Sequence, residues 1–204
     1  MKEAGVATAL QASGTGTRYW TVPISRAVLA LIPAAIITFN RDHSATFGLL
    51  AFGSFALASG VLLAVLSWLT LDDVRARRLF LIQGIVGIVA GALALAFHMG
   101  GLGFFLYLVS VWAAVTGFLE LYSGSRARGR SLMAKDWMLL GGFTAVLALL
   151  FLLLPPNAVV SVGLLGAYLV MIGVYLVIAG LSLKWATTDA ARTVAPVAHD
   201  SDSQ

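Results

Sequence analysis

Residues 102–121, LGFFLYLVSVWAAVTGFLEL, form an apolar run whose length decides the fold class. About 20 residues of α-helix cross the roughly 30 Å hydrocarbon core of a bilayer. Only helices and closed barrels satisfy every backbone polar group in lipid, and this run is too long for a barrel strand. The run therefore predicts a transmembrane helix, although it carries one carboxylate, Glu120, near its end.

Further apolar runs of the same kind occupy 22–39, 44–71, 79–99, 137–154 and 158–183. The chain is 60% hydrophobic and 11% charged, whereas a soluble domain carries about a quarter charged residues. We therefore expect an all-α membrane protein with six transmembrane helices in a domain at 22–184. A segment at 1–21 precedes that domain, and the polar tail at 185–204 is expected to be disordered in the cytoplasm.

Basic residues predict the orientation of the helices, because Lys and Arg collect in cytoplasmic loops. Twelve of the 13 Lys and Arg lie on the side that holds both termini and the 72–78 and 122–136 loops, and Arg41 alone lies on the other side. Both termini are therefore expected in the cytoplasm, with contacts to the bilayer and to its anionic lipids. This distribution explains the net charge of +4 without a nucleic-acid partner.

A repeat of small and aromatic residues runs through the chain. Gly60, Gly117 and Gly173 close similar motifs that are 57 and then 56 residues apart, each with an aromatic residue five positions earlier. The repeat predicts three tandem antiparallel hairpins at 22–71, 79–121 and 137–184. Small residues let helix backbones approach closely in lipid, either within a hairpin or between one hairpin and the next. The predicted helix-packing residues are Gly53, Gly60, Gly84, Gly87, Gly91, Ser110, Gly117, Gly141, Gly166 and Gly173.

Three polar residues are expected at one depth, about one helical turn from the cytoplasmic surface. Arg26 and Gln83 occupy equivalent repeat positions, and Glu120 stands where the other hairpins have leucine. Charges inside a membrane edge pair, face the bundle interior or snorkel to the surface, and some mark proton or ion paths. Three interpretations of Glu120 follow: a structural pair with Arg26, snorkelling toward Arg126 or Arg128, and a role in moving protons or another ion.

The sequence gives little indication of a pH-responsive site, a metal site or a catalytic site. His43 and His98 fall at outer turns, where a group that titrates between about pH 5 and 8 would charge in an acidified exterior, although polar turn residues are ordinary. Two histidines without acidic companions make a poor metal site. The chain has no cysteine, and its motifs show no catalytic constellation, cofactor fingerprint or phosphate loop. We expect a protein that is not an enzyme and that holds no metal or cofactor.

Residues 136–184 resemble the last hairpin of the HdeD family of small six-helix bacterial membrane proteins, above all in LLPPNAVVSVGLLGAYLVMIGV. Hairpin two is similar to the central hairpin of that family, including the spacing from Gly117 to Glu120. Arg26 precedes Ala27 where the family often has Arg-Gly. The family often places aromatic-Pro-Gly at each outer turn, whereas here only Pro155 fits that pattern.

The resemblance implies a multi-pass protein of the bacterial plasma membrane with a role in stress, because the founding member of the family is linked with acid resistance. It suggests a non-enzymatic protein that assists another membrane protein or forms a homo-oligomer. The alternative is a channel or proton-linked transporter that uses Glu120.

Overall fold

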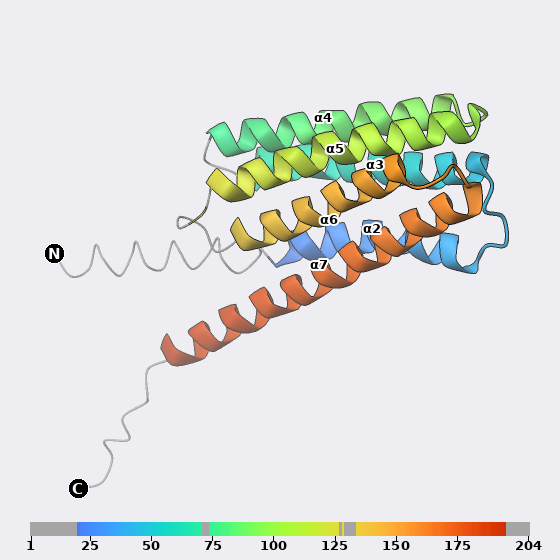
Figure 1. The fold of residues 1–204 in the computed structure, drawn as a ribbon. Helices are drawn as coiled ribbons and strands as arrows, with labels where there is room; N and C mark the ends of the chain where they lie inside the picture. The colour runs from blue at the N-terminus through green and yellow to red at the C-terminus, as the bar shows by residue number, and fades with distance from the viewer. Residues whose placement is uncertain (1–19, 71–73, 127, 129–133, 195–204) are drawn as a thin grey trace, which may run out of the picture.

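The computed structural model describes residues 20–70, 74–126, 128 and 134–194 (Figure 1). Six helices are found there, and each is long and apolar enough to cross a membrane. Their bounds are α2 at Thr21–Phe39, α3 at Ala45–Thr70, α4 at Val74–Ala96, α5 at Gly101–Arg126, α6 at Ala134–Leu153 and α7 at Ala158–Val194. Over the described residues the chain is therefore all-helical, with the length and apolarity of a multi-pass membrane protein, as the apolar runs predict.

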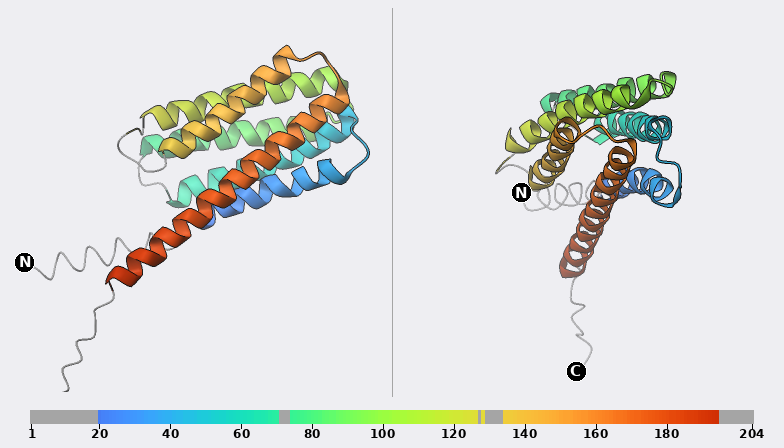
Figure 2. Two further views of the ribbon diagram at one scale, coloured as in Figure 1. Left: turned by 60° about the horizontal axis from the view of Figure 1, so that its bottom comes forward. Right: turned by 45° about the vertical axis from the view of Figure 1, so that its right-hand side comes forward.

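The helices form a bundle with two distinct ends (Figures 1 and 2). We call the end of the bundle at which α2 begins and α7 ends the terminal end. The opposite end, which we call the turn end, carries three short turns that join α2 to α3, α4 to α5, and α6 to α7. Each turn forces the two helices that it joins to run antiparallel.

Local hydrogen bonds fix where the helices start at the turn end. Ser44 Oγ accepts a hydrogen bond from the Phe47 amide at 3.2 Å, and Asn157 Oδ1 accepts one from the Val160 amide at 3.1 Å. Side-chain oxygens of this kind satisfy amides that have no partner in the first turn of a helix. At the turn between α4 and α5, Gly101 adopts a φ of +75°, a conformation that favours glycine.

Close packing occurs between hairpins, where two pairs of helix backbones meet at glycines. A Cβ added to Gly60 of α3 would lie 2.6 Å from the Gly84 carbonyl oxygen of α4, and one added to Gly91 would lie 2.5 Å from the Leu57 nitrogen. In the second pair, a Cβ on Gly117 of α5 would lie 2.8 Å from the Ala145 nitrogen of α6. Of the two kinds of packing that the sequence leaves open, these glycines pack against a helix of another hairpin and not against the partner in their own.

The third helix pair joins the end of the chain to its beginning. Gly166 and Gly173 of α7 face Ile37 and Leu31 of α2, and a Cβ on either glycine would meet the facing side chain within 2.7 Å. Side chains rather than backbone atoms make this contact, so α7 and α2 do not use a glycine-to-backbone contact here. Ser110 is half-buried on α5 and donates to the Tyr107 carbonyl of its own helix at 2.9 Å, so its packing role stays a prediction.

α7 extends beyond the apolar run and leaves the rest of the bundle (Figure 2). The helix continues to Val194, so the expectation of disorder from residue 185 is wrong for 185–194. Alanine and arginine in the sequence ATTDAAR are strong helix formers, which is enough to continue an existing helix. Residues 195–204 of the predicted tail, and residues 1–19 of the predicted first segment, lie outside the described residues.

Candidate functional site

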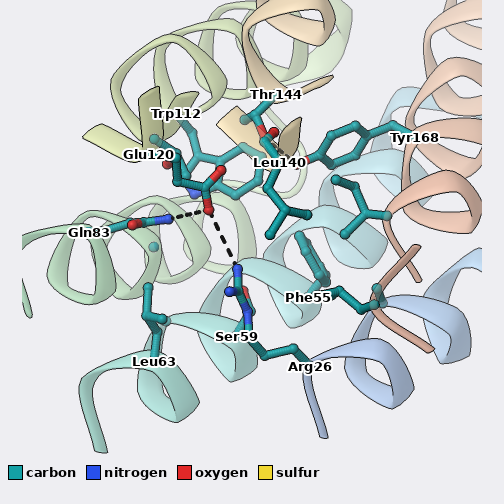
Figure 3. A pocket seen from close by; sticks show the side chains of 16 residues that line it. Arg26, Phe55, Ser59, Leu63, Gln83, Trp112, Glu120, Leu140, Thr144 and Tyr168 are labelled. Atoms are coloured by element: carbon teal, nitrogen blue, oxygen red, sulfur yellow. Dashed lines mark hydrogen bonds and ion pairs between the residues drawn. The ribbon is translucent and has the colours of Figure 1, made fainter. Parts of the chain in front are cut away.

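The structure brings together the three polar side chains that the sequence places at one depth. Gln83 Nε2 of α4 donates a hydrogen bond of 2.8 Å to Glu120 Oε1 of α5, and Arg26 Nη2 of α2 lies 3.5 Å from the same oxygen (Figure 3). Three helices from two hairpins thus converge on one carboxylate. Arg126 donates instead to the hydroxyl of Tyr122 on its own helix at 3.2 Å. Glu120 is buried, so the interpretation that it snorkels to the surface is wrong.

The ion pair between Arg26 and Glu120 is loose on the arginine side. The contact uses one nitrogen and one oxygen, whereas strong Arg–carboxylate pairs are commonly bidentate. The Arg26 side chain keeps 23% of its surface exposed, against 6% for Glu120. The carboxylate is therefore fixed in the interior, and the guanidinium is the partner with room to move.

Two buried oxygens on α5 have no hydrogen-bond partner among the described residues. They are Glu120 Oε2 and Thr116 Oγ1. The two residues are four apart on one helix and therefore share a face. Buried polar atoms without partners are uncommon in native structures, and their desolvation costs on the order of 1–3 kcal/mol each.

The carboxylate borders a cavity of about 50 Å³. Fifteen of its lining residues fall into sets of three that the chain spaces 57 and then 57 or 56 residues apart, and Gly60 is the sixteenth. The sets are Arg26, Gln83 and Leu140; Ala30, Gly87 and Thr144; Phe55, Trp112 and Tyr168; Ser59, Thr116 and Ile172; Leu63, Glu120 and Leu176. Each of the helices α2 to α7 therefore contributes to the wall of the cavity.

Aromatic rings line the deep side of the cavity. The rings of Phe55 and Trp112 meet edge to face, with centroids 6.0 Å apart. The Tyr168 hydroxyl lies 2.9 Å from Thr144 Oγ1, which also donates to the Leu140 carbonyl at 2.8 Å. The sequence analysis does not predict this hydrogen-bonded pair. No periodicity in the sequence indicates that pair, because it joins two different helices.

The cavity has an open side and a closed side. Among its lining residues, Arg26 of α2 and Ser59 and Leu63 of α3 are half-buried and the others are buried, so the wall is most exposed at α2 and α3. Toward the turn end, Phe52, Val109 and Leu165 are fully buried, one residue from each hairpin at the same repeat spacing. The Phe52 ring packs on Trp112 with centroids 5.2 Å apart. This apolar layer separates the cavity from the turn end.

A second cavity of about 60 Å³ borders the first on the far side of Arg26. It lies between α2, α6 and α7 and shares Arg26, Leu140 and Leu176 with the first cavity. Its wall includes Asp136, whose Oδ1 accepts a hydrogen bond from the Tyr175 hydroxyl. Arg26 therefore lines two cavities, each of which has a carboxylate-bearing residue in its wall.

The two histidines that the sequence predicts as pH-responsive residues lie in the turn region. His43 Nδ1 is 3.4 Å from the Arg41 carbonyl oxygen, and His98 Nδ1 is 3.0 Å from that of Leu95. The Nδ1 atom of each histidine thus contacts the backbone of its own turn or helix end. The polar cluster around Glu120 belongs to the other half of the bundle, so the structure does not join the two sets.

Comparison with known proteins identifies one family. Residues 82–154 match the family described as a short repeat of unknown function, DUF308. The match covers less than half of the chain and runs from within α4, through α5, to the end of α6. It includes Gln83 and Glu120 but only the first part of 136–184, the segment that carries most of the resemblance to the HdeD family. No curated protein and no solved structure matches the chain.

Proposed function

We propose that the chain is a non-enzymatic, non-conducting protein of the bacterial plasma membrane, of the HdeD-like type, that assists another membrane protein. The observation that carries the non-conducting part is the layer of Phe52, Val109 and Leu165, which is fully buried between the polar cavity and the turn end. A proton or ion path needs polar groups or water through the whole bundle. The polar cluster of Arg26 and Glu120 then serves as a contact that joins hairpins one and two.

The repeat of three hairpins is part of this proposal. Its support is that contacts recur at equivalent positions: Gly60 meets Ile88, Gly117 meets Ala145, and Gly173 meets Leu31. The three partners are 57 residues apart from Leu31 to Ile88 and from Ile88 to Ala145. Residues from one position of each hairpin also line the cavity together, which is the arrangement that a threefold pseudosymmetric bundle would produce.

The proposed orientation places the terminal end in the cytoplasm. Arg77 stacks over the Trp68 ring at 5.1 Å, and Lys184 over the Trp20 ring at 5.1 Å. Tryptophan rings settle at the headgroup level, and basic residues favour the cytoplasmic leaflet with its anionic lipids. Reporter fusions after Val194 and within 97–100 should report opposite sides of the membrane, with the former in the cytoplasm.

The competing function is proton-linked transport, and one observation favours it. Glu120 Oε2 is a buried carboxylate oxygen without a protein partner among the described residues, next to a cavity large enough for water. A transporter would require a second route from that cavity across the apolar layer.

Proton flux in liposomes that carry the pure protein distinguishes the two functions. A pH-sensitive dye trapped inside would report the internal pH after an acid jump outside, with gramicidin as the positive control. We expect the same decay as in empty liposomes for wild type and for Glu120→Gln, with folding checked by circular dichroism. Wild-type flux that is lost in Glu120→Gln would replace this proposal with transport.

The accessory and stress roles rest on the resemblance and the family match, and they have their own test. Cross-linking in native membranes, followed by purification, should recover a stoichiometric membrane protein with the chain. Recovery of a cross-linked homo-oligomer instead would assign the assembly to copies of the chain itself. Cells that lack the protein should survive an acid challenge less well than cells that carry it.

A further inference from the structure

The cavity beside Glu120 offers hydrogen-bond acceptors that the protein leaves unused. Glu120 Oε2 and Thr116 Oγ1 are buried, border the same space and lack a partner among the described residues. A carboxylate oxygen accepts only. The group that fits here must therefore bring donors.

The walls of the cavity indicate the charge and the size of that group. The rings of Phe55, Trp112 and Tyr168 face the same space as the carboxylate, and aromatic faces attract cations within about 6 Å. A volume of about 50 Å³ has room for only about three to five water-sized groups, since one water needs about 10–15 Å³. Two free oxygens are too few for a hard metal cation, because Ca²⁺ takes about six to eight.

The charge balance depends on Arg26. A second cation beside the intact ion pair would add an uncompensated charge to a low-dielectric interior, which is costly. Arg26 is the more exposed partner of the ion pair, and it also lines the second cavity, whose wall includes Asp136. Movement of the guanidinium toward Asp136 would leave Glu120 to the incoming cation, and each carboxylate would then have one cation beside it.

We propose that the cavity beside Glu120 binds a small cation with N–H donors, of the class of ammonium and methylammonium. Glu120 Oε2 and Thr116 Oγ1 accept its hydrogen bonds, the aromatic rings cover its other faces, and Arg26 moves aside toward Asp136. The cation enters and leaves at α2 and α3, where the wall is most exposed. This site goes beyond the proposed function, because binding from one side requires no passage across the apolar layer.

Calorimetric titration of the pure, detergent-solubilised protein with methylammonium chloride tests the site, with sodium chloride at equal ionic strength as the reference. Saturable binding is expected for wild type and not for Glu120→Gln. Tetramethylammonium, which has no N–H donor and is bulkier, should not bind. Absence of saturable methylammonium binding by folded wild type would overturn the proposal and leave the cavity to water alone.

A matched pair of variants keeps the test decisive if Glu120→Gln does not fold. Thr116→Val removes a free acceptor and should weaken binding by about tenfold, the effect of about 1.4 kcal/mol. Ser110→Ala changes a hydroxyl on the same helix that lies outside the cavity lining and already donates to the Tyr107 carbonyl at 2.9 Å, and it should leave affinity within about twofold. Equal affinities for these two variants would contradict the proposed contacts.

Replacement of Arg26 by the bound cation at Glu120 predicts effects on binding that a purely structural role of Arg26 and Asp136 would not produce. Asp136→Asn keeps an oxygen for Tyr175 but removes the charge that receives the guanidinium, and it should weaken methylammonium binding. Arg26→Gln removes the resident cation and should tighten binding severalfold. Weaker binding by Arg26→Gln, with circular dichroism unchanged, would contradict the exchange.

Discussion

The amide of Gln83, on α4, donates a hydrogen bond of 2.8 Å to the buried carboxylate of Glu120 on α5. This contact is shorter than the 3.5 Å that separates Arg26 from the same oxygen. A neutral amide therefore holds Glu120 within hairpin two, and the charged partner comes from hairpin one. In this cluster Gln83 and Glu120 are therefore held together within hairpin two, and Arg26 is the partner that is free to move.

A double-mutant comparison tests the pairing of Arg26 with Glu120. Glu120→Leu leaves Arg26 and Gln83 without their acceptor and should lower the free energy of unfolding by about 1–3 kcal/mol. Arg26→Leu combined with Glu120→Leu should recover much of that loss, because removal of both partners is milder than removal of one. Reversible unfolding in mixed micelles measures both variants. Unchanged stability of Glu120→Leu would show that the pair does not stabilise the fold.

Two adjacent glycines of α6 test the close packing between hairpins. A Cβ on Gly141 would lie 2.7 Å from the Leu121 nitrogen, whereas nothing lies within 4 Å of one on Gly142. Gly141→Ala should therefore destabilise the protein by about 1–3 kcal/mol through overpacking. Gly142→Ala should be neutral or stabilising by up to about 1 kcal/mol, because alanine favours the helix. The same unfolding assay compares them, and similar losses in both would contradict the backbone contact.

The hydroxyls of Thr144 and Tyr168 test whether α6 and α7 are joined by a hydrogen bond. Their oxygens are 2.9 Å apart and buried. Thr144→Val and Tyr168→Phe should each cost about 1 kcal/mol, and the double variant should cost less than the sum of the two, because residues in one hydrogen bond are coupled. Additive losses in the unfolding free energy would indicate that the two hydroxyls act independently.

The apolar layer offers a test with a lipid-facing control. Phe52 is fully buried, whereas Phe118 has 67% of its surface exposed. Phe52→Ala should lower the free energy of unfolding by about 3 kcal/mol, because it removes contacts and leaves a cavity. Phe118→Ala removes one stacking contact, with Tyr122 at 6.3 Å between ring centroids, and should lower the free energy of unfolding by about 1 kcal/mol or less. A small effect at Phe52 would mean that the layer is not tightly packed.

Much of the fold follows from the sequence, because each transmembrane helix satisfies its own backbone and requires only length and apolarity. The convergence of Arg26, Gln83 and Glu120 also follows, since the repeat fixes their common depth. The choice of neighbours does not follow: Gly60 could face either side of its helix, and only three-dimensional packing places it on Gly84. Neither do the cavity and the free oxygen of Thr116, because they depend on the space left between six helices.

The central claim is that the polar cavity is open near the terminal end and sealed toward the turn end. The most direct test of this claim uses the natural absence of cysteine. Ser59→Cys places one thiol in the cavity wall with little change in volume. Oriented proteoliposomes would be treated with a small, charged, membrane-impermeant thiosulfonate from one side or the other. We expect labelling from the terminal side only. Labelling from the turn side, or from neither side of a folded protein, would contradict the claim.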